Sequence, residues 1–125
     1  MGDDSPLVLA RIWFHTNDED KDSDTRVEIR VETVAKDLVA SLADDLGHFD
    51  DHTDAGPFDL ELNSVPTRGA LKNGHVALKI VPNGNDTWRF NFFLDLLFAD
   101  GAHLLALATG LELSENRSQL AFGIM

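Results

Sequence analysis

The side chains with the clearest chemical potential form an acidic run near the start of the chain. Residues 17–25 read N-D-E-D-K-D-S-D-T, with five carboxylates against one lysine. Carboxylates crowded into so short a segment repel one another and destabilise the fold unless a positive group lies close. A hard divalent cation, calcium above all, binds through several oxygen ligands from flexible loops. The run therefore predicts a calcium site, whose ligands would be Asp18, Asp20, Asp22 and Asp24.

A second oxygen-rich segment follows later in the chain. It supplies three more candidate ligands, Asn83, Asn85 and Asp86. Loops after alternate strands of an antiparallel sandwich meet at one end, so the two segments would form an oxygen-rich cup if the strand order brings them together. The helix–loop–helix calcium motif is excluded. Ser23 stands where that loop requires glycine, and Ile29 stands where it requires glutamate.

Histidines and tryptophans leave two further alternatives open. His48 and His52 lie four residues apart with two aspartates between them, which suits zinc or another transition metal, although loop histidines are more often simply solvated. Trp13 lies on the polar side of its segment and could stack on a sugar ring, whereas Trp88 begins an apolar face and is expected in the core. Trp13 is thus the candidate ligand-binding residue.

Nothing in the sequence indicates catalysis. No nucleophile motif surrounds any serine. Adjacent acid pairs such as Asp44–Asp45 and Asp50–Asp51 would point to opposite faces of a strand. The absence of cysteine excludes disulfides and thiolate chemistry. We therefore predict that the protein is not an enzyme.

Composition narrows the class of protein and its partners. With 125 residues and 43% hydrophobic content, the chain has room for one folded domain. A formal charge of −12 opposes binding to nucleic acid, which requires basic surface. No apolar stretch approaches the roughly 20 residues of a membrane span, and the acidic start lacks the pattern of a secretory signal. The expected location is cytoplasmic by default, unless a leader has been removed.

Hydrophobic alternation with period two sets the expected fold. It occurs in the segments 8–14, 27–31, 58–62, 76–80, 88–98, 105–107 and 120–124. Asp100–Gly101, between two of these segments, is a strong signal for a tight hairpin. We predict an all-β protein, an antiparallel eight-stranded β-sandwich, with a disordered acidic N-terminus at 1–6 and a single domain over 7–125.

One segment departs from this pattern. Residues 33–46 have apolar side chains at helical spacing, with Thr33 as an N-cap and Gly47 as a C-cap. Leu38, Ala40 and Leu42 would equally form a strand. We predict one short helix over 33–46, with a strand as the alternative.

Several of these segments resemble PLAT (lipoxygenase-homology) domains. Residues 10–16, A-R-I-W-F-H-T, with the acidic run and the strand 24–31, resemble the opening two strands of that family, and 76–88 is similar to its later strand, polar turn and tryptophan. The resemblance covers about a third of the chain. It implies an eight-stranded sandwich that contacts a protein or lipid surface, here through a bound calcium ion.

Two other functions stay open. A carbohydrate-binding module would use Trp13 as its sugar platform. A self-associating structural protein, for example a homodimer, would cover the apolar residues expected on the outer side of the long hairpin, namely Phe93, Leu97, Leu105 and Leu107.

Overall fold

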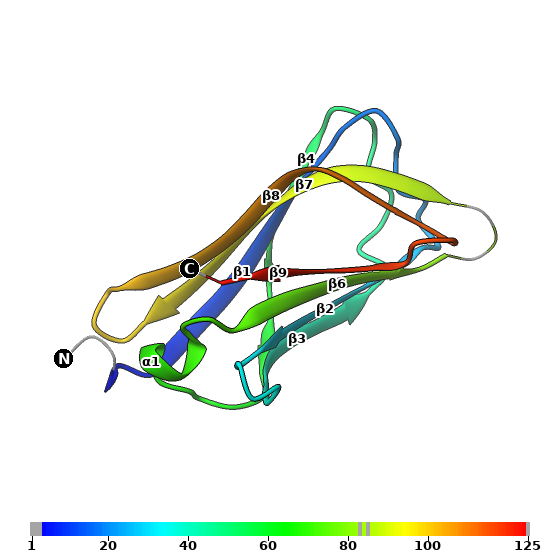
Figure 1. Cartoon of the computed structure of the whole chain (residues 1–125). Coiled ribbons are helices and arrows are strands. Elements are labelled where there is room, and N and C mark those ends of the chain that lie inside the picture. Colours follow the sequence, from blue (N-terminus) through cyan, green and yellow to red (C-terminus); the bar gives the residue numbers. More distant parts are fainter. Residues whose placement is uncertain (1–3, 83, 85, 125) are drawn as a thin grey trace.

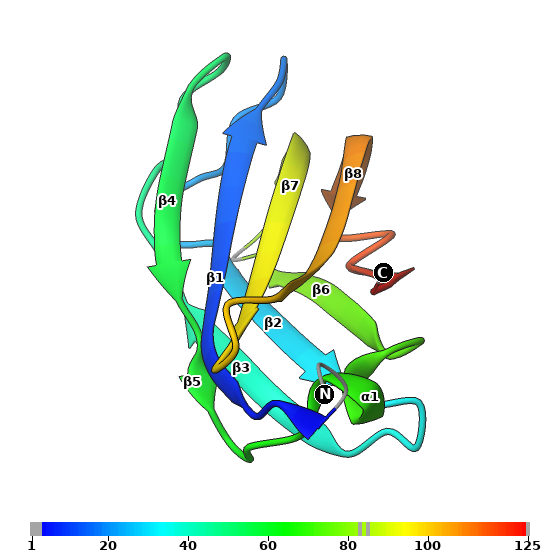
Figure 2. The same cartoon turned by 90° about the vertical axis from the view of Figure 1, so that its left-hand side faces the viewer.

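The chain folds into two antiparallel β-sheets packed face to face (Figures 1 and 2). The computed structural model describes residues 4–82, 84 and 86–124. Its strands are β1 (Leu7–Thr16), β2 (Arg26–Glu32), β3 (Leu38–Asp44), β4 (Asp54–Asp59), β5 (Glu61–Leu62), β6 (His75–Val81), β7 (Thr87–Phe98), β8 (His103–Ser114) and β9 (Gln119–Gly123). The predicted all-β sandwich is confirmed, with nine strands among the described residues rather than eight.

Several pairs of consecutive strands belong to different sheets. One sheet has the order β4-β1-β7-β8 and the other β5-β3-β2-β6-β9, and every pair is antiparallel. The hairpin predicted at Asp100–Gly101 joins β7 to β8. The chain crosses from one sheet to the other after β1, β3, β4, β6 and β8. Because β1, β3, β6 and β8 all run toward the same end of the sandwich, the connections that follow these four strands meet there.

The core lies between the sheets and follows the predicted alternation. In β7 every second residue from Trp88 to Phe98 is buried, and β1 buries Ala10, Ile12 and Phe14. The intervening side chains of both strands face outward. Strand periodicity therefore decides which residues of β1 and β7 remain available for binding.

The helix predicted over 33–46 is wrong. This stretch forms a turn followed by β3, which pairs with β2 along its length and briefly with β5. Backbone pairing with two neighbouring strands outweighs the local helical spacing. In the turn, the Thr33 hydroxyl accepts a hydrogen bond from the backbone N–H of Asp37. The helix within the described residues is instead α1 (Arg68–Leu71), capped by the Thr67 side chain.

The ninth strand arises because the segment 58–62, predicted as a single strand, contributes to two strands. The alternation over 58–62 is divided between β4 and β5, which belong to opposite sheets. Leu60, between them, is buried in the core. The chain thus passes from one layer to the other within three residues.

The start of the chain packs against α1 and the β7–β8 hairpin. Residues 1–3 lie outside the described residues. Ser5 is buried, its carbonyl accepts from the N–H of Arg68, and its hydroxyl accepts from the N–H of Asp100. Among the described residues, no helix is long and apolar enough to cross a membrane.

Candidate functional site

An open, acidic cavity lies where the connections between the sheets meet. Its volume is about 280 Å³. It is lined by Glu19, Asp20, Asp22, Asp86, Thr87 and Glu115. We call this cavity the acidic cup. Its residues come from the connections β1–β2, β6–β7 and β8–β9 and from the start of β7, so the strand order does bring the two predicted oxygen-rich segments together.

The four predicted aspartates of the first loop do not converge on one point. Asp20 and Asp22 line the acidic cup, whereas Asp18 points to Arg89, with 3.2 Å between its Oδ2 and the Nη1 of the guanidinium. Asp24 is exposed and is not among the residues that line the cup. Of the second predicted segment, Asp86 lines the cup, and Asn83 and Asn85 lie outside the described residues.

His48 joins the acidic side chains at the rim. A ligand nitrogen of His48 and carboxylate oxygens of Asp20 and Asp22 lie within 4.8 Å of one another. The Nε2 of His48 is also 2.8 Å from a carboxylate oxygen of Asp50. Among the described residues, His52 does not belong to this group.

Asp86 ties the second segment to the first loop. It is largely buried, and its Oδ2 accepts hydrogen bonds from the backbone N–H of Asp22 and from the hydroxyl of Thr25. Its charge lies close to that of Asp22. Repulsion by Asp86, followed by burial and by Asp20 and Asp24, raises the pKa of the Asp22 carboxyl above its ordinary value, against an opposing effect of His48. The cup therefore gathers negative charge at an energetic cost.

The lysine of the acidic loop turns inward instead of facing the cup. Lys21 is 0% exposed, and its Nζ donates to the backbone carbonyls of Asp22, Thr25 and Asp45 at 3.0, 3.1 and 2.6 Å. It lies 4.9 Å from the centre of the Phe49 ring. Burial lowers the pKa of Lys21, and the neighbouring carboxylates, Asp86 foremost, oppose that shift. Sequence reasoning missed this role, because nothing in the pattern D-K-D shows that the lysine is buried.

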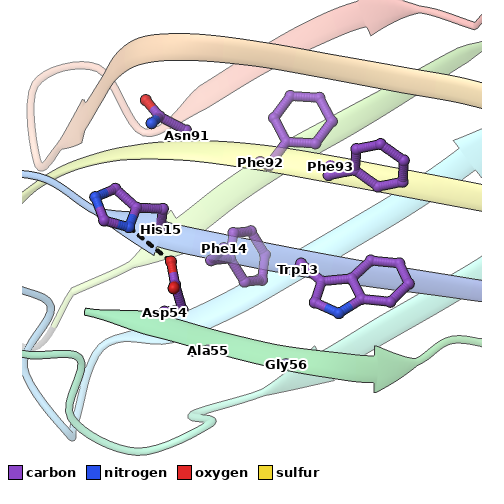
Figure 3. Close-up of a pocket in the computed structure, with 9 residues that line it drawn as sticks. All are labelled: Trp13, Phe14, His15, Asp54, Ala55, Gly56, Asn91, Phe92 and Phe93. Atoms are coloured by element: carbon purple, nitrogen blue, oxygen red, sulfur yellow. Dashed lines mark hydrogen bonds and ion pairs between the residues drawn. The ribbon is translucent and has the colours of Figure 1, made fainter. Parts of the chain in front are cut away.

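A second concavity lies on the outer face of the β4-β1-β7 part of its sheet. It has a volume of about 270 Å³ (Figure 3). It is lined by Trp13, Phe14, His15, Asp54, Ala55, Gly56, Asn91, Phe92 and Phe93. We call it the aromatic groove. The position of Trp13 on the outer side of β1 was foreseen from the sequence, but its neighbours from β4 and β7 were not, because their pairing depends on strand order.

No protein-family model and no curated protein matches this chain. The sandwich is established by the structure itself. The resemblance to PLAT domains stays a prediction.

Proposed function

We propose that the protein is a non-catalytic β-sandwich module that binds a divalent cation, calcium above all, in the acidic cup. The observation that carries the proposal is that five carboxylates line one concave cavity. None of the described residues that line the cup is basic. The nearest lysine of the loop, Lys21, is engaged with three carbonyls on the inner side. A cation in the cup would relieve the repulsion between Asp22 and Asp86.

The ligand chemistry favours a hard ion. Calcium takes six to eight oxygen ligands from carboxylates, carbonyls and water in a flexible geometry. Asp20, Asp22 and Asp86 supply part of such a shell, and Glu19 and Glu115 supply longer side chains at its edge. A transition metal would instead use the His48 nitrogen with Asp20 and Asp22. The excess of oxygen over nitrogen in the cup makes calcium the better candidate.

A bound ion would also provide the means of contact with a partner. The cup is open to solvent, so a bound calcium ion would keep coordination positions for a phosphate or carboxylate of a protein or lipid surface. Without the ion, the net charge of −12 repels such anionic groups. The proposed module therefore binds its partner surface only when the cation is present.

Thermal unfolding of metal-free protein during a calcium titration tests the proposal. Binding to the folded state raises the free energy of unfolding by about 2.7 kcal/mol when free calcium exceeds its dissociation constant a hundredfold. The double variant Asp20→Asn/Asp22→Asn should lose this gain. Because the same change relieves repulsion, the metal-free variant should melt no lower than the native protein.

Matched controls come from the same loop. Asp24→Asn and Asp18→Asn remove the same charge outside the cup and should retain the calcium-dependent gain. Equal losses in control and cup variants would show a diffuse charge effect and would contradict a defined site. An unchanged melting temperature in millimolar calcium would exclude the calcium site. Stabilisation by zinc alone, abolished by His48→Ala, would assign the cup to a transition metal.

A further inference from the structure

We propose that the aromatic groove is a second, independent binding site, and that its ligand is the ring of a neutral pyranose sugar. The groove shares no lining residue with the acidic cup. It combines a fixed aromatic platform with hydrogen-bonding groups that the fold leaves accessible.

The platform is the indole of Trp13. Trp13 faces outward from β1, and its register partner on β7 is Phe93. The two rings meet edge to face, with centroids 5.6 Å apart and an interplanar angle of 79°. Trp13 is partly buried and Phe93 is 38% exposed, so both offer apolar surface to solvent.

The opposite side of the indole is set by β4. At Gly56 a Cβ would lie 3.4 Å from the Cδ1 of Trp13 and 2.9 Å from the carbonyl oxygen of Ile12. Gly56 also has a φ of +117°, which side chains rarely adopt. The indole is thus packed between the backbone of β4 and the ring of Phe93. A platform already fixed in orientation loses little conformational entropy when a ligand binds.

Three polar side chains lie at the other end of the groove (Figure 3). The Nδ1 of His15 and the Oδ1 of Asp54 are 2.7 Å apart, which leaves the His15 Nε2 and the second Asp54 oxygen for a ligand. The Oδ1 of Asn91 accepts from the Asn17 side chain at 3.1 Å and from the Gly110 N–H at 2.8 Å. These bonds orient the Asn91 amide and leave its nitrogen as a donor. The carboxylate accepts from hydroxyls, and the amide donates to them.

The combination selects a sugar ring over other ligands. A volume of about 270 Å³ lies just below the roughly 300–1,000 Å³ of sites for drug-sized ligands, so one ring fits better than a larger molecule. An anionic ligand would meet the Asp54 carboxylate and the net charge of −12. A purely apolar ligand would remove water from the His15–Asp54 pair and would offer no hydrogen bonds in place of those lost. A neutral pyranose has an apolar C–H face for Trp13 and hydroxyls for the polar end.

A glycan array probed with the whole chain is the first experiment, followed by calorimetric titration of the methyl glycoside of the best hit. Neutral, uronic and sulfated glycans are compared in calcium and in chelator. We expect neutral glycans to bind under both conditions, because the cup and the groove are separate. Failure of calcium binding would therefore leave this proposal standing, and the converse also holds.

Variants then locate the site. Trp13→Ala should weaken binding about tenfold, at the upper end of what one aromatic contact contributes, and Trp13→Phe should retain most of the affinity. Asn91→Asp, which introduces a second carboxylate, should also weaken binding. The control is Leu107→Ala, since Leu107 is 59% exposed on the neighbouring strand β8 but does not line the groove. Its affinity should be unchanged.

Fluorescence gives a readout of the groove in solution. The chain has two tryptophans, and Trp88 is 1% exposed, with its indole N–H donating to the Thr16 hydroxyl. The sugar should therefore change the emission of Trp13 only, and Trp13→Phe should abolish the change while preserving the melting temperature. Absence of any neutral-glycan hit, or equal losses in Trp13→Ala and Leu107→Ala, would overturn the proposal. Self-association that disappears in Trp13→Ala, with no glycan bound, would assign the groove to a second copy of the chain.

Discussion

The inner and outer sides of the loop 17–25 differ in how their charged side chains are compensated. On the inner side, one ammonium group, that of Lys21, is surrounded by three carbonyl oxygens and packed against Phe49. On the outer side, Asp20, Asp22 and Asp86 line one cup, and no described residue of its lining is basic. The inner side thus contains a cation, the Lys21 ammonium group. The outer side contains carboxylates that could act as ligands of a bound cation.

The difference shows that charge composition and charge placement are separate questions. A buried charge is tolerated only when hydrogen bonds replace its water, and the carbonyls around Lys21 do this. Carboxylates at an open rim keep their water, so their repulsion is weakened but not removed. The excess of acid in the loop is therefore compatible with folding without metal. The remaining repulsion between the carboxylates of the cup still favours the binding of a cation.

The largest expected effect is that of Lys21→Met. The substitution keeps an unbranched apolar side chain but leaves the carbonyls of Asp22, Thr25 and Asp45 without their donor. A buried acceptor left without its donor costs about 1–3 kcal/mol, so the loss of a donor shared by three carbonyls should lower the free energy of unfolding by more than the loss of any single hydrogen bond. Urea denaturation of the metal-free protein measures the loss.

The control is Lys79→Met on β6, since Lys79 is exposed and carries the same charge. It should change the free energy of unfolding by less than about 0.5 kcal/mol. If both variants lose the same amount, the cage around Lys21 contributes nothing beyond net charge, and the two sides of the loop would not differ as described.

The two sides also differ in how far the sequence could predict them. The five carboxylates in nine residues can be read directly from the sequence. The alternation in β1 and β7 predicted both the sandwich and the outward position of Trp13. The burial of Lys21 depends on where the connection before β4 places Phe49 and the Asp45 carbonyl. That is a long-range contact without a local signal.

The same limit explains why the aspartates of the first loop have different neighbours and why the helix predicted over 33–46 is wrong. Asp18 and Asp20 are two residues apart in a loop, yet Asp18 meets Arg89 of β7 and Asp20 meets His48 of another connection. Only the strand order decides these partners. Likewise, the apolar residues of 38–44 fit a helix or a strand, and the pairing of β3 with β2 settles the matter.

A smaller effect is expected at the junction of the two sides, where Asp86 accepts from Asp22 and Thr25. Asp86→Ala leaves the buried Thr25 hydroxyl without its acceptor and should cost about 1–3 kcal/mol. Asp86→Asn keeps an oxygen acceptor and removes the charge next to Asp22, so it should cost less. Denaturant unfolding of both variants measures the difference.

A double-mutant cycle sharpens this result. Thr25→Val replaces the hydroxyl by a methyl group of similar shape. If the hydrogen bond between Thr25 and Asp86 stabilises the junction, Asp86→Ala should cost less in the Thr25→Val background than in the native protein. Additive losses would show that Asp86 acts through its charge or its contact with Asp22 alone.

The smallest effect concerns pH, and it isolates the outer side. The pKa of Asp22 is raised in the folded protein, so between 3.8 and that raised pKa the folded state binds more protons than the unfolded state. The free energy of unfolding therefore falls as pH rises through this window. Asp22→Asn removes this term, so the metal-free variant should be more stable at neutral pH by a few tenths of a kcal/mol, roughly the size of a screened surface interaction.

The quantity to measure is the difference in the free energy of unfolding between Asp22→Asn and the native protein, because other groups titrate in the opposite sense. The hydrogen bond from His75 lowers the pKa of Glu32, so the stability that Glu32 provides is present above its unfolded pKa and lost as pH falls through the folded one. This term is common to Asp22→Asn and the native protein and cancels. Chemical denaturation at pH values from about 3 to 7 should show the gap opening as pH rises. If the metal-free native protein is instead more stable than Asp22→Asn at neutral pH, the carboxylates of the cup are not in net repulsion. Relief of repulsion would then not favour the binding of a cation in the cup.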